Sequence, residues 1–290
     1  MDVIPGTDAL RGDLGRLLFA VGVFDGLHRG HRYLLGRLRR AATRLGARPA
    51  VITFDHHPDE ILRGQAPPLL CDPEERLVRL ARLGVEVTVV EHFDRRLRET
   101  PYDVYVERIA ERVDLAGFLM TPDAAFGFER RGTPEALRRL AAGAGWTVVV
   151  VPAFVVDGQQ VRSGEIRSRI EAGDLEAARR LLGRRYAVTG RLELEAREGT
   201  ALVVPELPVA LPPAETYRVR VGSAWRLVDG RTGPAAGLDP PPDRSPIVRV
   251  AVAERDGERL RLTVRAGFGG LAQADRVRVV FEGRSPGAMP

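Results

Sequence analysis

The 290-residue chain contains no lysine and no asparagine, so all 44 of its basic residues are arginine. The absence of lysine excludes a Schiff-base lysine, a lysine-linked pyridoxal phosphate and the GxxxxGK[ST] phosphate loop. Cys71 is the only cysteine, which excludes an intramolecular disulfide and any multi-cysteine zinc or iron–sulfur site. No apolar run approaches the roughly 18 residues that a membrane span needs, and the first residues do not resemble a secretory signal. We therefore predict a cytoplasmic protein with no membrane partner.

Charge of one sign is not in large excess either. The sequence pI is about 10.0, but the net charge is only +5 because 39 acidic residues are mixed among the basic ones. A nucleic-acid footprint needs basic residues gathered on one face. Arg37, Arg39, Arg40 and Arg44 form a basic face on one predicted helix, which is interpreted as solvated rather than nucleic-acid-binding. Attraction of phosphorylated small molecules explains the charge balance equally well. We predict no nucleic-acid partner, and the sequence leaves the oligomeric state open.

Strand and helix patterns alternate along the first 150 residues. Residues 17–24 form a mostly apolar run, typical of a strand buried on both faces, and residues 31–45 follow with helical periodicity. Asp72, Pro73 and Glu75 mark a second helix start, with an N-cap, a proline at N1 and a glutamate at N3. Further strands are predicted at 50–54, 85–90, 115–120 and 147–151, with a small hairpin at 155–161. Further helices are predicted at 102–113 and from 133, where Thr133, Pro134 and Glu135 form a second capping signal. This alternation predicts an α/β fold, a Rossmann-like parallel sheet covered by helices on both faces.

The pattern changes near residue 184. Short segments then alternate apolar with polar residues between breaks rich in proline and glycine, which is typical of an antiparallel β-barrel. We predict an N-terminal domain at 1–183 and a C-terminal barrel domain at 184–290. The barrel segments are 186–194, 217–221, 247–253, 260–264 and 276–281, and the main breaks are 205–213 and 233–246.

The most informative segment is VGVFDGLHRGH at residues 21–31, where the first apolar strand gives way to the first helix. Ligands of open parallel sheets bind at such carboxyl ends. Gly22, Gly26 and Gly30 would let the backbone approach a ligand closely. His28 and His31 are three residues apart at a helix start, so both imidazoles are expected on one face, near the free N–H groups of the first turn. Two imidazoles placed there could donate hydrogen bonds to the equatorial oxygens of a phosphorus atom that is under nucleophilic attack.

A second candidate phosphate site lies further along the chain. Ser163 is a plausible helix N-cap, whose hydroxyl and neighbouring amides could bind an anion. Arg167, one turn later, offers a planar guanidinium for phosphate. On these residues alone, a plain cap and a solvated arginine explain the pattern as well. The run of residues 91–94, EHFD, is interpreted as a loop of mixed charge rather than a metal site, because no partner ligands are evident.

Residues 22–31, GVFDGLHRGH, resemble the GxFDGxHxGH signature of the bacterial bifunctional riboflavin kinase/FAD synthetases, within the HxGH nucleotidyltransferase superfamily. The resemblance continues in order through residue 183. Residues 53–58 are similar to the family's TFxPHP, residues 126–132 to its FGxxRxG, and residues 161–167 to its (I/V)SSTxIR. The chain departs from the family at Val23, where asparagine is usual, at His56 in place of a proline, at Ala124 in place of an aromatic residue, and at 162–165, which keep one of three expected hydroxyls.

The resemblance implies a transferase, an FMN adenylyltransferase that moves AMP from ATP to FMN and releases FAD and pyrophosphate. His28 and His31 would be the catalytic residues, and Mg²⁺ would accompany ATP, with its protein ligands unknown. The implied nucleotide-binding residues are Gly22, Phe24, Asp25, Gly26, Gly30, Ser163 and Arg167. The implied flavin-side residues are His57, Asp123 and Phe126.

The resemblance weakens in the barrel. Residues 198–207, EGTALVVPEL, stand where the family's kinase domain carries GxxLGxPTAN, whose threonine and asparagine help to hold phosphates and magnesium. We therefore expect riboflavin kinase activity to be lost. Two other functions stay open: nucleotidyl transfer to another phosphorylated acceptor, such as pantetheine phosphate, nicotinamide mononucleotide or glycerol phosphate, and a non-catalytic protein that binds flavin or nucleotide as a regulator.

Overall fold

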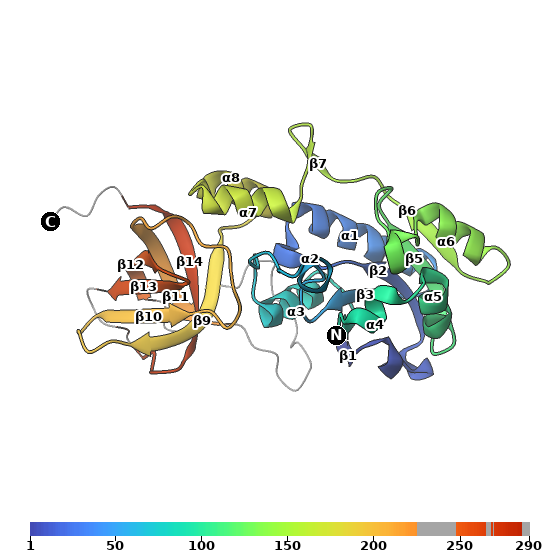
Figure 1. Cartoon of the computed structure of the whole chain (residues 1–290), viewed down its shortest axis with the longest axis horizontal. Helices are drawn as coiled ribbons and strands as arrows, with labels where there is room; N and C mark the ends of the chain where they lie inside the picture. The colour runs from blue at the N-terminus through green and yellow to red at the C-terminus, as the bar shows by residue number, and fades with distance from the viewer. Residues whose placement is uncertain (225–247, 265–267, 269, 286–290) are drawn as a thin grey trace.

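The computed structural model describes residues 1–224, 248–264, 268 and 270–285. An open sheet with its helices occupies one end of the molecule and a closed β-barrel the other, with two helices, α7 (Ser163–Glu171) and α8 (Leu175–Leu182), between them (Figure 1). This arrangement confirms the predicted fold class. Within the described residues, every helix is too short or too polar to cross a membrane.

The open sheet is entirely parallel and has the strand order β1-β4-β3-β2-β5-β6. The two central strands, β2 and β3, are nearly all apolar and are buried along almost their whole length, as expected for strands covered on both faces. The strands are β1 (Asp2–Pro5), β2 (Arg16–Val21), β3 (Arg48–Phe54), β4 (Val87–Glu91), β5 (Asp114–Met120) and β6 (Thr147–Val150).

Alternate side chains of β2 enter two separate cores. Leu17 and Phe19 pack with side chains of α5, whereas Leu18 and Ala20 pack with side chains of α1 and α3. The sheet is thus covered on both faces, as predicted. The helices of this part are α1 (Arg29–Arg44), α2 (Asp59–Arg63), α3 (Pro73–Arg82), α4 (Arg95–Glu99), α5 (Tyr102–Ala110) and α6 (Pro134–Ala141), with short 3-10 turns at Thr7–Ala9, Gly12–Leu14, Asp25–Leu27 and Phe128–Arg130.

The capping signals are confirmed in detail. Asp72 accepts hydrogen bonds from the backbone N–H groups of Glu74 and Glu75 at the start of α3, and Thr133 caps α6. The predicted hairpin forms from β7 (Val155–Val156) and β8 (Gln159–Gln160). The sequence did not predict β1, which has only four residues and lies at the edge of the sheet.

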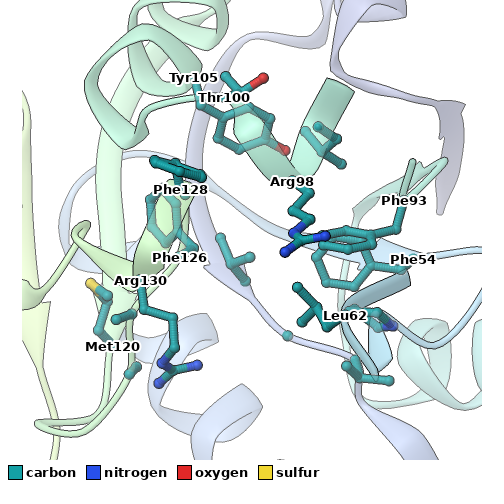
Figure 2. A pocket seen from close by; sticks show the side chains of 18 of the residues that line it. Phe54, Leu62, Phe93, Arg98, Thr100, Tyr105, Met120, Phe126, Phe128 and Arg130 are labelled. Carbon is teal, nitrogen blue, oxygen red and sulfur yellow. The ribbon is translucent and has the colours of Figure 1, made fainter. Parts of the chain in front are cut away.

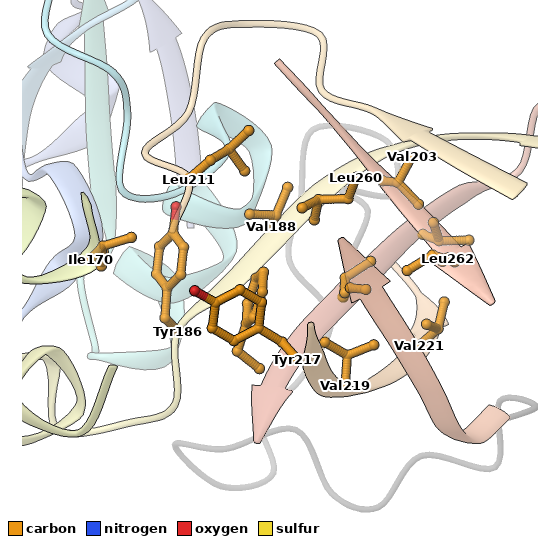
Figure 3. Packing of buried hydrophobic residues seen from close by; sticks show 14 of the residues in the cluster. Ile170, Tyr186, Val188, Val203, Leu211, Tyr217, Val219, Val221, Leu260 and Leu262 are labelled. Carbon is orange, nitrogen blue, oxygen red and sulfur yellow. The ribbon is translucent and has the colours of Figure 1, made fainter. Parts of the chain in front are cut away.

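The six strands of the barrel close in the order β10-β13-β12-β11-β14-β9. Inward-facing side chains fill its interior, among them Val188, Val219, Leu260 and Leu262 (Figure 3). Five strands correspond to the predicted segments, and β10 was missed; the predicted break at 233–246 lies outside the described residues. The strands are β9 (Ala187–Leu194), β10 (Thr200–Val204), β11 (Tyr217–Ser223), β12 (Val248–Asp256), β13 (Arg259–Val264) and β14 (Arg276–Arg284).

The barrel core extends into the first part of the chain. Ile170 of α7 and Leu182 of α8 belong to the same buried cluster as Tyr186 and Leu211 (Figure 3). The backbone of Leu69 also exchanges hydrogen bonds with Pro208 and Ala210 in the segment before β11. A domain boundary at residue 183 remains a prediction, but a cut there would pass through a continuous apolar core.

Candidate functional site

The turn that follows β2 is compact and strained. Phe24, Gly26 and Leu27 all have positive φ, at 52°, 72° and 42°, a region that residues other than glycine rarely adopt. A Cβ at residue 26 would lie 2.9 Å from the Cβ of Leu70, so only glycine fits there. Outliers of this kind store energy and persist at functional sites when the surroundings enforce them.

The turn ends at a pair of stacked imidazoles. His28 is the N-cap of α1, and its Nδ1 accepts a hydrogen bond of 3.3 Å from the backbone N–H of His31. The two ring centroids are 3.7 Å apart with an interplanar angle of 19°. Gly30 makes room for this stack, because a Cβ there would lie 3.1 Å from the His28 ring. The structure therefore brings the two predicted catalytic histidines together at the carboxyl end of the central strand.

Both imidazoles are neutral at physiological pH. Burial, and next the charge of Arg184, lower the pKa of His28 to about 3, and burial together with His28 lowers the pKa of His31 well below its ordinary value. Because Nδ1 of neutral His28 accepts a hydrogen bond, its proton must be on Nε2. His28 can therefore act as a neutral N–H donor towards a ligand oxygen.

One ring atom of the pair lacks a partner. Nδ1 of His31 is buried and, within the described structure, has no hydrogen-bond partner. A buried polar atom left in this state costs roughly 1–3 kcal/mol. A bound ligand or an ordered water that reached this nitrogen would remove the penalty, as expected at a substrate site.

The start of α7 lies directly beside this turn. The hydroxyl of Ser163 donates to the backbone carbonyl of Asp25 at 3.1 Å, and the guanidinium of Arg167 forms a 3.1 Å ion pair with the Asp25 carboxylate. The structure thus joins two motifs that are 138 residues apart in sequence. Ser163 is not the N-cap, contrary to the sequence prediction. The N-cap is Arg162, without a side-chain cap, and Ser163 is the first helical residue, because its hydroxyl is used to hold the turn.

The remaining nucleotide-side predictions differ in their exposure. Gly164, which was not among them but follows Ser163, has open space where a Cβ would stand, so the first turn of α7 is accessible to a ligand on that side. Phe24 is buried, with its ring 5.2 Å from that of His31, and only its backbone could contact a nucleotide. Asp25 is also buried, and its carboxylate accepts from the Leu70 N–H and from Arg167. Phe24 and Asp25 therefore support the turn from inside the protein.

A large cavity opens beside the turn, at the carboxyl edge of the sheet. Its volume is about 790 Å³, within the range of small-molecule sites. Figure 2 shows Phe54, Phe93 and Leu62 on one side of the cavity and Phe126, Phe128 and Met120 on the other. Val21, Gly22 and Val23 also line it. A cavity with facing aromatic side chains suits a flat, largely apolar ring system such as an isoalloxazine.

Two of the three flavin-side predictions line this cavity. His57 and Phe126 both do, and burial lowers the pKa of His57. Asp123 does not line it. Its carboxylate accepts from the hydroxyl of Thr121 at 2.8 Å and lies 3.4 Å from Arg162, so it contacts the segment that leads into α7.

Several residues that line the cavity were not predicted from the sequence. Arg98 and Arg130 also line the cavity and supply positive charge (Figure 2), and the acidic residues Asp59 and Glu129 belong to the same lining. Arg130 and its neighbour Glu129 have φ of 56° and 53°, which marks the turn of residues 127–130 as a second strained segment at the site. Arg130 lies in the FGxxRxG-like segment and could have been named from it. Phe93 and Arg98 follow β4, and no sequence pattern indicated them.

The comparisons with known proteins address the same residues. A sequence model of the FAD synthetase family matches residues 12–165, a range that includes the turn after β2, the cavity and the start of α7. The chain belongs to the FAD synthetase family. The match ends before the barrel begins.

Alignments with similar bacterial proteins cover more of this chain than the family match does. The bifunctional riboflavin kinase/FMN adenylyltransferase of Pseudomonas fluorescens is 29% identical over 234 residues, which are 78% of this chain and 75% of that protein. The protein of the same name from Bacillus subtilis is 28% identical, over 76% of this chain and 72% of that protein. A protein from Geobacillus thermodenitrificans, described as a putative bifunctional riboflavin kinase/FMN adenylyltransferase, is 32% identical over 57% of this chain and 88% of its own length.

A solved structure extends the likeness to the whole fold. The crystal structure of a macrolide-efflux protein from Streptococcus pneumoniae matches with a TM-score of 0.76, covering 100% of this chain and 91% of that one. The sequence identity is 20%, so this likeness shows the fold alone. It places the sheet and the barrel of this family member together in one known architecture.

Proposed function

We propose that this chain is an FMN adenylyltransferase, which transfers AMP from ATP to FMN and yields FAD and pyrophosphate. The observation that carries the proposal is the stacked pair of neutral imidazoles, His28 and His31, at the carboxyl end of β2. The turn that carries the pair contacts the start of α7 through Asp25 and Ser163, and its residues Gly22 and Val23 line the large aromatic cavity. Nucleotide and flavin would therefore meet above the same turn.

The reaction needs in-line attack at the α-phosphorus of ATP. A phosphate oxygen of FMN forms the new P–O bond, and the bond from the α-phosphorus to the pyrophosphate oxygen breaks. Nε2–H of His28 would donate to an α-phosphate oxygen and stabilise the charge that develops there. The neutral state of the imidazoles is suited to this, because a donor that keeps its proton needs no proton transfer during the step. Backbone N–H groups at the start of α7, with Arg167 nearby, would hold the β- and γ-phosphates.

Magnesium fits this scheme as a companion of ATP. Mg²⁺ prefers oxygen ligands and keeps several waters. The Asp25 carboxylate beside the turn is already bound to Leu70 N–H and Arg167, so it has little capacity left for a cation. We therefore propose that the ion arrives on the triphosphate and neutralises part of its charge, while the chain binds the phosphate oxygens that remain.

The direct test is incubation of the purified protein with ATP, Mg²⁺ and FMN. We expect FAD and pyrophosphate in equal amounts, and recovery of unchanged FMN would contradict the proposal. The double variant His28→Ala/His31→Ala should lose at least about 100-fold in rate, since one such hydrogen-bond donor is commonly worth 10²–10³. Quenching of FMN fluorescence provides the folding control, because the variant should still bind FMN in its cavity. Pantetheine phosphate, nicotinamide mononucleotide and glycerol phosphate, offered in place of FMN, test the alternative acceptors.

We also propose that the barrel does not phosphorylate riboflavin. The supporting observation is the sequence at 198–207, EGTALVVPEL, which lacks the threonine and asparagine of the family's PTAN segment. Half of that stretch forms β10, an ordinary strand whose buried side chains Ala201 and Val203 join the barrel core. Incubation with riboflavin, ATP and Mg²⁺ should yield no FMN and no ADP. Formation of either would contradict this part of the proposal.

A further inference from the structure

A cluster of two histidines and one carboxylate lies outside the nucleotide turn. Asp55 and His56 follow β3, and His92 follows β4, the neighbouring parallel strand. The ladder pairs Phe54 with Glu91 and continues through a 3.0 Å hydrogen bond from the Asp55 N–H to the Glu91 carbonyl. The register of two parallel strands therefore brings the three side chains together.

The carboxylate of Asp55 is the centre of the cluster. Its Oδ2 lies 2.6 Å from Nδ1 of His92, and its Oδ1 lies 3.3 Å from Nδ1 of His56. Backbone N–H groups of His56 and Phe93 also donate to Oδ1, at 2.7 and 3.4 Å. These backbone bonds fix the orientation of the carboxylate, as outer hydrogen bonds do for metal ligands.

The donor atoms are close enough for one metal ion. One ligand atom from each of the three residues lies within 4.8 Å of the others. Metal–ligand bonds of about 2.0–2.1 Å place tetrahedral ligands roughly 3.3 Å apart. The side chains of His56 and His92 are 51% and 71% exposed, so small rotations can close the difference.

We propose that Asp55, His56 and His92 bind one divalent transition-metal ion of the zinc type. Two imidazoles and one carboxylate suit Zn²⁺ and its neighbours in the first transition row, whereas Mg²⁺ prefers oxygen ligands. The site is therefore separate from the magnesium that accompanies ATP. It lies at the rim of the aromatic cavity, because Phe54, His57 and Phe93, next to the three ligands in sequence, line that cavity. A bound ion would tie the segment that carries His57 to the end of β4.

The test uses the full-length protein with any affinity tag removed, titrated with Zn²⁺ by calorimetry and with Co²⁺ by visible absorption. We expect one ion per chain from both measurements. His92→Ala and His56→Ala should each weaken Zn²⁺ binding by roughly tenfold or more. A large excess of Mg²⁺ should leave the zinc affinity unchanged. Neither ATP nor FMN is present, so the outcome is independent of the adenylyl transfer.

The matched control is His57→Ala. This imidazole is adjacent in sequence, but its Nδ1 accepts from the backbone N–H of Asp59, and its loss should leave the zinc affinity unchanged. Saturating Zn²⁺ should also raise the thermal midpoint of the wild type by about 5 °C and that of His92→Ala by much less. Without metal, His56→Ala and His92→Ala should have the same thermal midpoint as the wild type, because both side chains are exposed; this comparison controls for folding. The assignment is overturned if the wild type shows no saturable one-to-one binding, or if both His56→Ala and His92→Ala bind as the wild type does.

Discussion

At the scale of single residues, His28 and His31 are unusual because the fold keeps them uncharged. Their depressed pKa values come chiefly from burial. A histidine whose pKa is lower in the native state than in the unfolded chain stabilises the native state above the unfolded pKa of 6.5. That contribution is lost as the pH falls towards the native pKa, because only the unfolded chain takes up the proton.

Acid should therefore destabilise the protein through this pair. Between pH 7 and pH 5 we expect each of the two histidines to account for about 2 kcal/mol of lost stability. The measurement is urea unfolding at both pH values for the wild type and for His28→Gln/His31→Gln. The double variant should lose clearly less stability over this interval. His57 and His92 are present in both proteins and cancel in the comparison, so equal losses would show that the pair is not held neutral.

Asp25 is the residue that connects the two phosphate-side motifs. Its buried carboxylate pairs with Arg167, which is 13% exposed, and also accepts from the Leu70 N–H. Removing one partner of a buried ion pair leaves the other charge uncompensated. We expect Asp25→Asn to lower the free energy of unfolding by about 3 kcal/mol and to reduce FAD formation, because the start of α7 is released from the turn.

Urea unfolding of Asp25→Asn measures this effect, and Asp13→Asn is its control. Asp13 pairs with Arg11 on the surface, where the two side chains are 70% and 64% exposed. Such a pair should change stability by less than about 0.5 kcal/mol. Equal stabilities of the two variants would mean that Asp25 does not hold α7 against the turn.

At the scale of secondary-structure elements, α3 is joined to barrel strands by buried charge. The carboxylate of Glu75 lies 2.6 Å from Arg79 on its own helix and 3.2 Å from Arg278 on β14, and accepts from the hydroxyl of Thr189 on β9. Burial alone would raise the pKa of Glu75, but the charges of Arg278 and Arg79 hold it well below its usual range. The carboxylate is therefore ionised at neutral pH and bridges helix and barrel.

Glu75→Gln should cost roughly 3–5 kcal/mol at pH 7. A carboxyl group with a depressed pKa stabilises the native state above its unfolded pKa, and that stability disappears as the pH falls through the native pKa. The difference between variant and wild type should thus shrink below about pH 4. Glu135→Gln, on an exposed helical pair with Arg139, should cost less than about 0.5 kcal/mol. Denaturant unfolding of the wild type and both variants across this pH range measures these costs. A cost of Glu75→Gln that does not depend on pH would exclude the ionic explanation.

Local signals predicted elements better than they predicted the site. The N-caps Asp72 and Thr133 were placed correctly because a cap is decided by a few adjacent residues. Ser163 was misplaced because its hydroxyl bonds to Asp25, a tertiary contact that no local pattern shows. His92 was interpreted as part of a plain loop because its partner, Asp55, is 37 residues away. Which side chains from neighbouring strands come into contact depends on the register of the parallel strands, and the sequence does not reveal that register.

At the scale of the whole molecule, the sheet part and the barrel share apolar core. Leu70, Ile170 and Leu182 belong to the same buried cluster as the interior of the barrel. The segment that contains Leu70 also carries Asp72, which pairs with Arg276 of β14 at 2.5 Å. The two parts should therefore unfold as one cooperative unit, because separating them would expose this core and break the ion pairs together.

Cys71, the single cysteine, lies in this junction segment and provides the probe. Its thiol is buried, and burial raises its pKa to about 12, so a thiol reagent should react only when the junction opens. The free energy of opening from Cys71 labelling should equal that of global unfolding, measured by the fluorescence of Trp146 in a Trp225→Phe variant. Trp146 packs against Phe118 in the sheet core, far from Cys71 in sequence. A labelling free energy lower by more than about 1 kcal/mol would mean that the barrel separates from an intact sheet. The labelling rate of the urea-unfolded chain supplies the intrinsic reactivity, so a slow thiol cannot be mistaken for a closed junction.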